Sequence, residues 1–530
     1  MGRRSRRRDQ HAASTHEAYA VTELSADIVI IGSGIGGATA ASVLADTGAR
    51  ILILERGELL QDTPETRDER AIFQRKHFRT KESWLDGTRT PFSPGNFYNV
   101  GGNSKFYGAI MYRNRAEDFA PQQHMEGSTP GWPFSYDEIE PWYGQAERLF
   151  CVRGELGDDP TEPPHSTRYD FPAVPDEPSI GKARQRLKKI GIHTSSLPIA
   201  IDHVAWLKRA PTPWDAFPDT FTGKIDAETG PLAAALAHDN VELLTGAEVL
   251  RLDTDASGKT IKQAMIRHKG QDVPVRANSF ILAAGAVNSA ALLLRSANGP
   301  HPNGLANGSD QVGRNFMNHN CSAMITLDPR LRNTAVHSKT FGFNDFYLHD
   351  TKTGFPLGNV QLLGKISGPI FKANMPSVPE FVTGLIARYS FDWYVMSEDL
   401  PNPESRVMVD GSAIVLDWQR SNMLGHRTLV ERVRGVFKAA GFPIVLSRAF
   451  DRRTPSHQCG TAKMGTDGAT SVVDTHCRSH DVENLYIMDA SVLPTSAAVN
   501  PALTIVAVTL RAASKLRAEL VQQSNAQEDR

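Results

Sequence analysis

One stretch near the start of the chain constrains its fold more than any other. Residues 26–31 read ADIVII, a continuous apolar run typical of a strand buried on both faces of a parallel sheet. Gly32, Gly34 and Gly37 follow at G-x-G-x-x-G spacing, and residues 38–45 (ATAASVLA) have good helix propensity. The pattern predicts a strand, a tight glycine turn and a helix.

A second strand and an acid complete this unit. Residues 50–54 read RILIL, and Glu55 follows them, 18 positions after Gly37. A carboxylate at about that distance accepts hydrogen bonds from an adenosine ribose. Gly32 permits the tight turn, and Gly34 lacks a Cβ, so a pyrophosphate can approach the backbone at the helix N-terminus. The unit predicts a dinucleotide site in a Rossmann-like domain, but it does not separate NAD from FAD.

Length and composition exclude several classes of protein. A chain of 530 residues is long enough for more than one folding unit. Its 58 Lys and Arg balance 59 Asp and Glu, and this near-zero charge argues against a nucleic-acid binder. The chain has no apolar run of about 18 residues, so we expect no membrane span. Its 4 cysteines include no C-x-x-C pair, which argues against a disulfide scaffold or a zinc site.

The N-terminus is basic and polar. Five of its first eight residues are arginines, and the polar sequence DQHAASTHEAYA follows them. A secretory signal, including one of the twin-arginine type, would continue with an apolar segment. We therefore expect residues 1–24 to form a disordered basic tail, and we expect a cytoplasmic protein.

Strand and helix patterns return later in the chain. Residues 155–235 are rich in proline and are expected to be irregular. Short apolar runs predict strands at residues 241–244, 247–252 and 278–283, and a helix at residues 289–295. Patches such as residues 322–327 and 407–409 predict a separate antiparallel sheet, interrupted by one helix at residues 428–440. The fold class is therefore α/β, or α+β overall.

The C-terminal part carries two polar residues of interest. His457 lies in the segment SHQCGTAKMG, and Asn500 opens the segment NPALTIVA, which begins a last helix reaching about residue 520. Pro501 suits the first turn of this helix, with Asn500 as its N-cap. From spacing alone, His457 is equally well a loop histidine with satisfied hydrogen bonds, and Asn500 a helix cap.

Taken together, these segments resemble the glucose–methanol–choline (GMC) flavoprotein oxidoreductases. The matching segments are, in chain order, DIVIIGSGIGGATAASVL with ERG, NVGGNSKFYG, ILAAGAVNSAALLL, VGRNFMNH, LPNPESRV, HQCGTAKMG and LYIMDASVLPTSAAVNPALTIVA. The resemblance covers residues 25–150, 240–320 and 450–525, which it implies form a discontinuous FAD-binding domain. Residues 151–239 and 321–449 match poorly and are expected to form the substrate-binding domain.

The resemblance implies that FAD is the cofactor. The residues expected around it are Gly32, Ser33, Gly34, Gly36, Gly37 and Glu55 at the pyrophosphate and ribose, Val249 at the adenine, Gly102, Asn103 and Ser104 at the isoalloxazine, and Asp489, Ala490 and Pro501 near the pyrophosphate and ring. Some members attach FAD covalently through a histidine two positions after the loop serine. This chain has Phe106 there, so we expect non-covalent FAD.

The resemblance also implies a reaction. His457 and Asn500 align with the family's catalytic pair in its His–Asn form, which pyranose and cellobiose oxidising members share. The implied reaction oxidises an alcohol, with a sugar, glycoside or cyclitol as the expected substrate, to a carbonyl. The hydride goes to flavin N5, His457 takes the hydroxyl proton, and Asn500 holds the hydroxyl. A general base of this kind contributes about 10²–10⁴ in rate.

Several alternatives stay open at this point. Oxygen, a quinone or a redox protein would each serve as electron acceptor. A redox-silent lyase and a non-catalytic FAD-binding protein would keep the same fold, and an NAD-dependent dehydrogenase would share the glycine turn.

Overall fold

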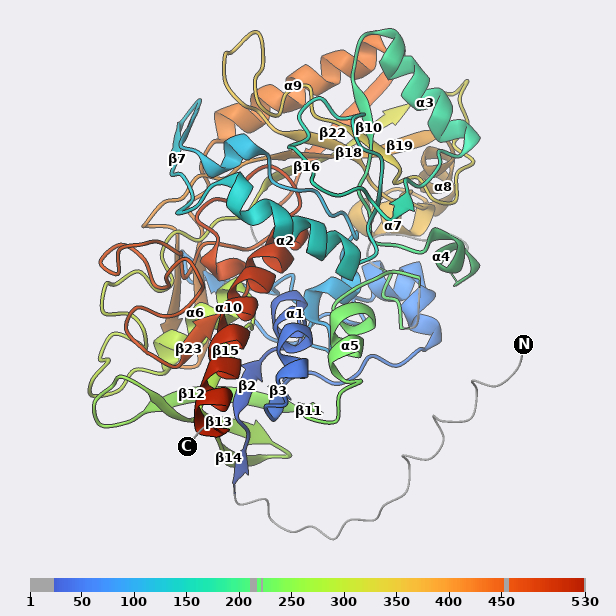
Figure 1. Ribbon diagram of the computed structural model, residues 1–530. Helices are drawn as coiled ribbons and strands as arrows, with labels where there is room; N and C mark the ends of the chain where they lie inside the picture. Colours follow the sequence, from blue (N-terminus) through green and yellow to red (C-terminus); the bar gives the residue numbers. More distant parts are fainter. Residues whose placement is uncertain (1–22, 210–216, 221–222, 452–456, 529–530) are drawn as a thin grey trace.

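The computed structural model describes residues 23–209, 217–220, 223–451 and 457–528. The expected basic tail therefore lies outside the described residues except at its end, where β1 (Leu24–Ser25) begins. Within the described ranges, none of the helices is both long and apolar enough to cross a membrane. Two large sheets lie at opposite ends of the molecule (Figure 1).

A five-stranded parallel sheet forms the first end. Its order is β11-β3-β2-β15-β23, with the bounds Val241–Leu244, Ile51–Leu54, Ile28–Ile31, Ser279–Leu282 and Leu485–Ile487. Every pair in it is parallel. All four residues of β2 and of β3 are buried, which explains why the sequence shows continuous apolar runs there. The Rossmann-like unit predicted from the glycine turn is confirmed.

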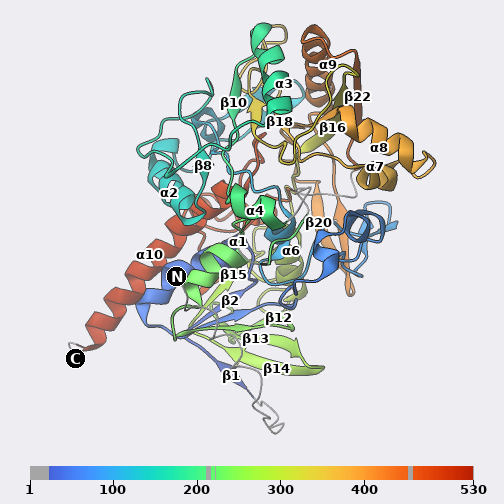
Figure 2. The same ribbon diagram turned by 90° about the vertical axis from the view of Figure 1, so that its right-hand side faces the viewer.

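Helices and a second sheet cover the parallel sheet. α1 (Ile35–Leu44) follows the glycine turn and packs against the long α10 (Ala502–Glu528), while α6 (Ala286–Arg295) follows β15. The second sheet has the order β1-β14-β13-β12, with β14 at Gln271–Arg276, β13 at Ile261–His268 and β12 at Ala247–Thr254. Figure 2 shows the parallel sheet between this second sheet and α1.

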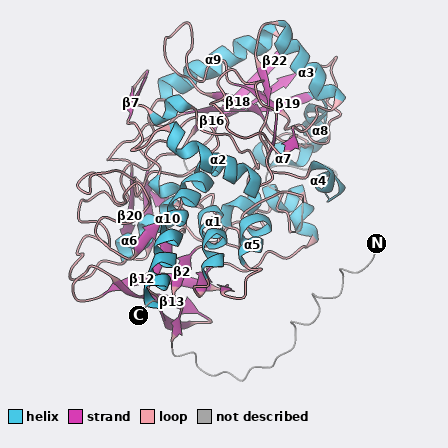
Figure 3. Cartoon of the chain, viewed as in Figure 1, coloured by secondary structure: helices cyan, strands magenta, loops and turns pink. Residues whose placement is uncertain are grey.

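A six-stranded sheet forms the other end of the molecule. Its order is β10-β17-β18-β19-β16-β22, with the bounds Thr194–Ser196, Phe341–Phe343, Asn359–Leu362, Ser390–Ser397, Asn320–Leu327 and Ile444–Ala449. All its pairs are antiparallel, as the sequence predicts. Helices α9 (Met423–Ala439) and α3 (Pro178–Lys189) lie against it (Figure 3).

The two faces of the antiparallel sheet differ in character. Trp393 and Leu362 pair across β19 and β18 and belong to the apolar cluster that includes Phe437 of α9. The next pair along, Tyr394 and Gln361, points to the opposite face because side chains alternate along a strand. One face is therefore an ordinary hydrophobic core, whereas the other carries polar side chains.

The structure corrects three expectations about local elements. Residues 407–409 lie in β20 (Arg406–Asp410), which belongs to a separate sheet with β21 (Ala413–Asp417), β4 (Trp84–Asp86) and β5 (Pro91–Phe92). An isolated apolar patch indicates a strand but not its partner, and here β21 pairs with a strand from far upstream. The stretch 155–235 is not irregular throughout, since α3, β10 and α4 (His203–Arg209) lie in it. α7 (Gly368–Asn374) and α8 (Glu380–Tyr389) are two further helices between the strands of the antiparallel sheet, where one was expected.

The remaining elements are short or peripheral. α2 (Tyr136–Leu149) packs on α10 and begins with a Ser135 capping box, and α5 (Ala233–Ala235) is a single turn. Two small ribbons complete the fold: β6 (Gln122–His124) with β7 (Gly127–Thr129), and β8 (Arg153–Gly154) with β9 (Phe171–Pro172). The division into FAD-binding and substrate-binding stretches stays a prediction.

Candidate active site

The glycine turn combines tight packing with one open position. Gly32 has φ 101°, and a Cβ on Gly37 would lie 1.9 Å from the Gly32 carbonyl oxygen, so neither position accepts a side chain. Gly34, at the N-cap of α1, is different, because a Cβ there would meet no atom within 4 Å. The helix start therefore faces open space at Gly34.

Glu55 holds the turn from the end of β3. Its buried carboxylate accepts hydrogen bonds from the Ser33 N–H (3.1 Å) and hydroxyl (2.7 Å) and from the Gly57 N–H (2.8 Å). Burial raises the pKa of this carboxyl above its usual value. The N–H of Gly101 donates in turn to the Ser33 hydroxyl at 3.1 Å. Glu55 and Ser33 thus connect the glycine turn to the loop that contains Gly102, Asn103 and Ser104.

That loop lies directly across from the turn. A Cβ on Gly102 would lie 3.6 Å from the Cα of Gly34, so the two glycines border the same space. The Asn103 side chain accepts a hydrogen bond from the Phe97 N–H at 2.9 Å, and the Ser104 hydroxyl accepts one from the Ala227 N–H at 3.0 Å. The polar side chains of the loop therefore tie it to the neighbouring backbone at Phe97 and Ala227.

The two residues after Ser104 anchor the loop to the body. The buried ammonium of Lys105 lies 3.0 Å from the Asp226 carboxylate and 2.7 Å from that of Glu228. Phe106 stacks on Phe97, with ring centroids 3.9 Å apart and an interplanar angle of 13°. A phenyl ring offers no atom for a covalent bond to a flavin at this position.

Asp489 supports the other side of the turn, just after β23. Its carboxylate accepts hydrogen bonds from the Gly285 N–H (2.9 Å) and the Ser289 hydroxyl (2.6 Å), at the start of α6. Gly36 packs so closely here that a Cβ would lie 1.8 Å from the Met488 carbonyl oxygen. Gly285 itself has φ 85° and, like Gly34, open space where a Cβ would be.

The remaining predicted cofactor residues lie at the borders of this region. The N–H of Ala247 donates to the Glu55 carbonyl oxygen at 2.9 Å, which places the start of β12 beside the acid. Val249 lies two residues further along, next to a bulge in the pairing with β13, where the backbone ladder is interrupted. Ala490 is buried, and its carbonyl oxygen accepts from the Gly460 N–H at 3.1 Å. Pro501 stands just before α10, and its carbonyl oxygen accepts the Ile505 N–H at 3.0 Å.

His457 is half-buried and held at two points. Its backbone N–H donates to the Asn318 side-chain oxygen at 2.7 Å, and its Nδ1 lies 2.7 Å from Nδ1 of His319. The ring of Tyr394 lies nearly perpendicular to that of His457, with centroids 6.3 Å apart. Burial lowers the pKa of His457 well below its usual value, and the nearby His319 and Lys339 lower it further.

Asn500 does not cap the last helix, contrary to the expectation from sequence. α10 begins at Ala502, and Pro501 supplies the first accepting carbonyl, so Asn500 stands one position before the cap. Its side-chain oxygen instead accepts a hydrogen bond from the Gln361 amide at 3.0 Å. Because proline has no N–H to be satisfied and fixes φ, it takes the cap position and leaves the Asn500 side chain to the antiparallel sheet.

The antiparallel sheet brings these two residues to one face. Gln361 and Tyr394 are direct partners across β18 and β19, which puts their Cβ atoms about 4.5–5.5 Å apart. Gln361 contacts Asn500, and Tyr394 contacts His457. His457 and Asn500 therefore each contact one member of the same cross-strand pair on the polar face of the sheet.

Comparison with known proteins places the chain in a family. Profiles of the GMC oxidoreductase family match residues 216–321 and 406–509, and a profile of an NAD(P)-binding Rossmann-like domain matches residues 30–60. The 6'''-hydroxyparomomycin C oxidase of Streptomyces lividus is 30% identical over 521 residues, covering 93% of this chain and 92% of that protein. The chain belongs to the GMC oxidoreductase family. The paromamine 6'-oxidase of Streptomyces fradiae is 29% identical over 531 residues, with 94% and 93% covered.

The fold of this GMC oxidoreductase also matches solved structures. Pyridoxine 4-oxidase from Mesorbium loti superimposes with a TM-score of 0.64 at 20% identity, covering 93% of this chain and 99% of that one. The sequence-based assignments of family, fold class and cofactor are confirmed. The protein is an FAD-dependent oxidoreductase that acts on CH–OH groups.

The geometry of the glycine turn fits FAD. A Cβ would meet no atom at Gly34 or Gly285, so a cofactor has room to approach the backbone at these two glycines. Gly32, Gly36 and Gly37 are closed by neighbouring backbone atoms. Glu55 supplies a buried carboxylate at the end of β3, where a ribose is expected to bind. We propose that the sequence-predicted residues around this space hold the pyrophosphate, ribose and ring of FAD.

Sequence reasoning missed three residues of the site. His319, Gln361 and Tyr394 contact His457 or Asn500 but carry no spacing signal of their own. His319 ends the segment VGRNFMNH, which contributed to the family resemblance without a role. His426, another buried histidine, lies on the opposite face of the sheet, where it bonds the hydroxyls of Ser322 (2.8 Å) and Ser397 (3.0 Å).

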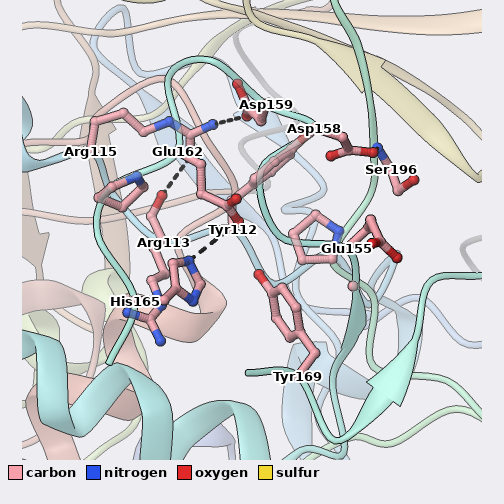
Figure 4. Close-up of a pocket in the computed structure, with 13 residues that line it drawn as sticks. Tyr112, Arg113, Arg115, Glu155, Asp158, Asp159, Glu162, His165, Tyr169 and Ser196 are labelled. Carbon is pink, nitrogen blue, oxygen red and sulfur yellow. Dashed lines mark hydrogen bonds and ion pairs between the residues drawn. The ribbon is translucent and has the colours of Figure 1, made fainter. Parts of the chain in front are cut away.

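A polar pocket is lined by charged residues that include Arg113, Arg115 and Asp159 (Figure 4). Arg113 makes two 2.7 Å contacts with the Glu147 carboxylate, and Arg115 lies 2.6 Å from Asp159. The space inside measures about 10 Å³, room for a single water molecule. Its ion pairs anchor the segment before α2 to α2 and to the segment after it, and the space is too small for a substrate.

Proposed function

We propose that this GMC oxidoreductase oxidises a hydroxyl of a sugar or aminoglycoside to a carbonyl, with His457 as the base. The observation that carries the proposal is the placement of His457 and Asn500 over the cross-strand pair Tyr394 and Gln361. A half-buried, neutral imidazole is the natural acceptor for a hydroxyl proton at neutral pH. Bound FAD supplies the hydride acceptor for the carbinol carbon.

Asn500 has a complementary role in the proposal. Its side-chain oxygen is engaged by the Gln361 amide, which leaves its own N–H groups to donate to the substrate oxygen. A donor at that oxygen stabilises the negative charge that develops as His457 removes the proton. Asn500 therefore orients the hydroxyl without competing for its proton.

The substrate class rests on two observations. The two relatives with the highest identity reported above are named as oxidases of hydroxyparomomycin and paromamine, both aminoglycosides. The Oε1 atom of Gln361 is buried without a hydrogen-bond partner among the described residues, so it is a candidate acceptor for a substrate hydroxyl or amine. A substrate with several O–H or N–H donors satisfies such an acceptor, whereas a simple alkyl alcohol does not.

The proposal includes an electron acceptor and a location. Both aminoglycoside relatives are named oxidases, which supports oxygen over a quinone or a redox protein.

All 4 cysteines are free thiols, as is usual in a reducing compartment, which supports the cytoplasm. Cell fractionation with a tagged chain tests the location.

An anaerobic substrate screen tests the reaction. Purified holoenzyme is mixed with aminoglycosides, neutral sugars, cyclitols and simple alcohols, and loss of the oxidised flavin band is recorded. We expect aminoglycosides or sugars to bleach the flavin, and oxygen to restore it with release of hydrogen peroxide. A flavin that no alcohol bleaches would favour the lyase or the non-catalytic alternative. Recovery of the oxidised flavin band only with a quinone or a redox protein would correct the acceptor.

A flavin that stays in the protein pellet after acid precipitation would overturn non-covalent binding.

The His457→Ala variant tests the base. We expect the variant to fold and keep FAD, while the rate of flavin reduction falls by about 10²–10⁴. In the wild type, the rate should drop with falling pH only below the usual histidine range, because the pKa of His457 is lowered and the base must be unprotonated. Stopped-flow bleaching across pH measures both effects. A variant that reduces its flavin at the wild-type rate would place the base elsewhere.

A further inference from the structure

His319 makes two hydrogen bonds that fix its protonation. Its Nε2 lies 2.9 Å from the backbone carbonyl oxygen of Ser496. A carbonyl oxygen only accepts hydrogen bonds, so Nε2 of His319 carries a proton. Burial lowers the pKa of His319 to about 4, so the ring is neutral at neutral pH. A neutral imidazole has a single N–H, and Nδ1 of His319 is therefore a bare acceptor.

The position of the proton on His457 follows from that on His319. Its Nδ1 lies 2.7 Å from the bare Nδ1 of His319, so the hydrogen between them belongs to His457. His457 is neutral as well, because its pKa lies well below the usual value. With its one proton on Nδ1, the Nε2 of His457 has a free lone pair. The reverse tautomer would put two lone pairs against each other at 2.7 Å.

Further hydrogen bonds support this chain of bonds. Asn318, next to His319, accepts the backbone N–H of His457 at 2.7 Å, and its own N–H donates to the Asp399 carboxylate at 3.1 Å. The N–H of Asp399 donates in turn to the Ser496 hydroxyl at 3.1 Å. Asn318 thus holds the backbone of His457, and His319 holds its ring. Asp399 in turn bonds Ser496, the residue whose carbonyl oxygen accepts from His319.

We propose that His319 is a positioning residue that fixes His457 in the tautomer with a proton on Nδ1 and a free Nε2. This inference rests on the proposed role of His457 as base. An imidazole that accepts a proton at Nε2 must present that lone pair to the substrate hydroxyl, and the hydrogen bond at the other nitrogen decides whether it does. In serine proteases, an aspartate performs this task for the catalytic histidine, and losing the correct tautomer there costs about 10⁴ in rate.

Two substitutions separate tautomer control from simple structural support. His319→Asn keeps a side-chain oxygen near the Nδ1 position, where it accepts from His457, but gives up the bond to Ser496. His319→Gln keeps an amide N–H near the Nε2 position for the Ser496 carbonyl, but gives up the acceptor for His457. We expect His319→Gln and His319→Ala to slow flavin reduction by about 10- to 100-fold, with little change in KM, and His319→Asn to retain most of the rate.

The matched control is His426→Gln. His426 is a buried histidine of the same sheet, but it bonds Ser322 and Ser397 on the face away from His457. We expect this variant to lose stability and keep the wild-type rate of reduction per bound FAD. If His319→Gln instead outperforms His319→Asn, the bond to Ser496 is what matters and tautomer control is overturned.

Ring-nitrogen spectroscopy gives a readout that does not depend on turnover. The oxidised holoenzyme, labelled with ¹⁵N-histidine, should show a protonated Nδ1 and an unprotonated Nε2 for His457, assigned by their absence in His457→Gln. The opposite tautomer would overturn the proposal. If His457→Ala is slow while His319→Ala reduces at the wild-type rate with an unchanged tautomer, only the role of His319 fails. If His457→Ala is fast, the proposed base itself fails.

Discussion

The parallel sheet and the antiparallel sheet differ in which part of each residue matters, the backbone in the first and the side chain in the second. In the parallel sheet, backbone shape is decisive: Gly32, Gly36 and Gly37 are needed because carbonyl oxygens lie where a side chain would start. In the antiparallel sheet, alternation is decisive, since Gln361 faces Asn500 while its neighbour Leu362 faces the apolar core. Under the proposed assignment of sites, the cofactor is held mainly by backbone, whereas the substrate side is made of replaceable side chains.

Two glycine substitutions in one turn are expected to have the largest effects. Gly37→Ala places a methyl group 1.9 Å from the Gly32 carbonyl oxygen, so the backbone must move, at a cost of about 3 kcal/mol or more. Gly34→Ala meets no atom within 4 Å and suits the φ of −67°, so the apoprotein should keep its stability to within about 0.5 kcal/mol. Its FAD should nevertheless be lost on gel filtration, because the methyl group occupies space that the pyrophosphate needs.

Thermal unfolding of the two apoproteins, followed by titration with FAD, measures this difference. A Gly34→Ala variant that binds FAD like the wild type would show that the open space at Gly34 is not the phosphate site. A Gly37→Ala variant with unchanged stability would show that the turn is less closely packed than the structure indicates.

Gln361→Leu tests the side-chain half of the comparison and should have a smaller effect. Leucine is similar in size but cannot donate to Asn500, and one such hydrogen bond is worth about 0.5–1.5 kcal/mol, or roughly 2- to 10-fold in kcat/KM. Gln263→Leu is the control, because Gln263 on β13 bonds Asp253 on β12, in the sheet beside the parallel one. Steady-state kinetics with the best substrate give kcat/KM for both variants. Equal kcat/KM in both variants would mean that Asn500 is oriented without Gln361.

His426→Gln should have the smallest effect on the reaction, and its distinctive signature is a changed pH dependence of stability in acid. Burial lowers the pKa of His426 to about 3 in the folded protein, whereas an unfolded chain has about 6.5. Between these values the unfolded state binds the extra proton, so wild-type stability falls as pH drops below about 6.5. At pH 5 this one group costs about 2 kcal/mol by linkage.

Glutamine does not titrate, so the stability of His426→Gln should fall less between pH 7 and pH 5 than that of the wild type. Buried acids such as Asp392, with a pKa raised to about 7 by burial, act in the opposite direction, but they are present in both proteins and cancel in the difference. Urea unfolding of both proteins at the two pH values measures this difference in stability loss. Parallel losses in both proteins would show that His426 is protonated in the folded state.

The sequence predicted the parallel half well because its signals are local. The strand, turn and helix around Gly32 follow one another directly, and a single motif encodes them. α3 lies in a proline-rich stretch that favours an irregular interpretation, although Ile180, Ala183 and Leu187 are buried at helical spacing after a proline.

The contacts of the candidate site could not be predicted in the same way. His319 meets His457 across 138 positions of sequence, and Gln361 meets Asn500 across 139. Neither separation leaves a periodic trace, because the partners meet only once the antiparallel sheet and the last loop have formed. For Asn500 the sequence leaves two roles open, a helix cap and a site residue, because the residue type suits both, and only the position of Pro501 in the folded chain excludes the cap.

The strand order of the parallel sheet also has a consequence for synthesis of the protein. β2 begins at Ile28, but the strand that completes the sheet, β23, begins only at Leu485, and Gly36 packs against the carbonyl of Met488 just after it. A ribosome adds about 5–20 residues per second, so the first strand waits roughly 20–90 s for the last. The apolar strands of the parallel sheet lack their last partner during that interval, so the sheet cannot be completed until translation is nearly finished.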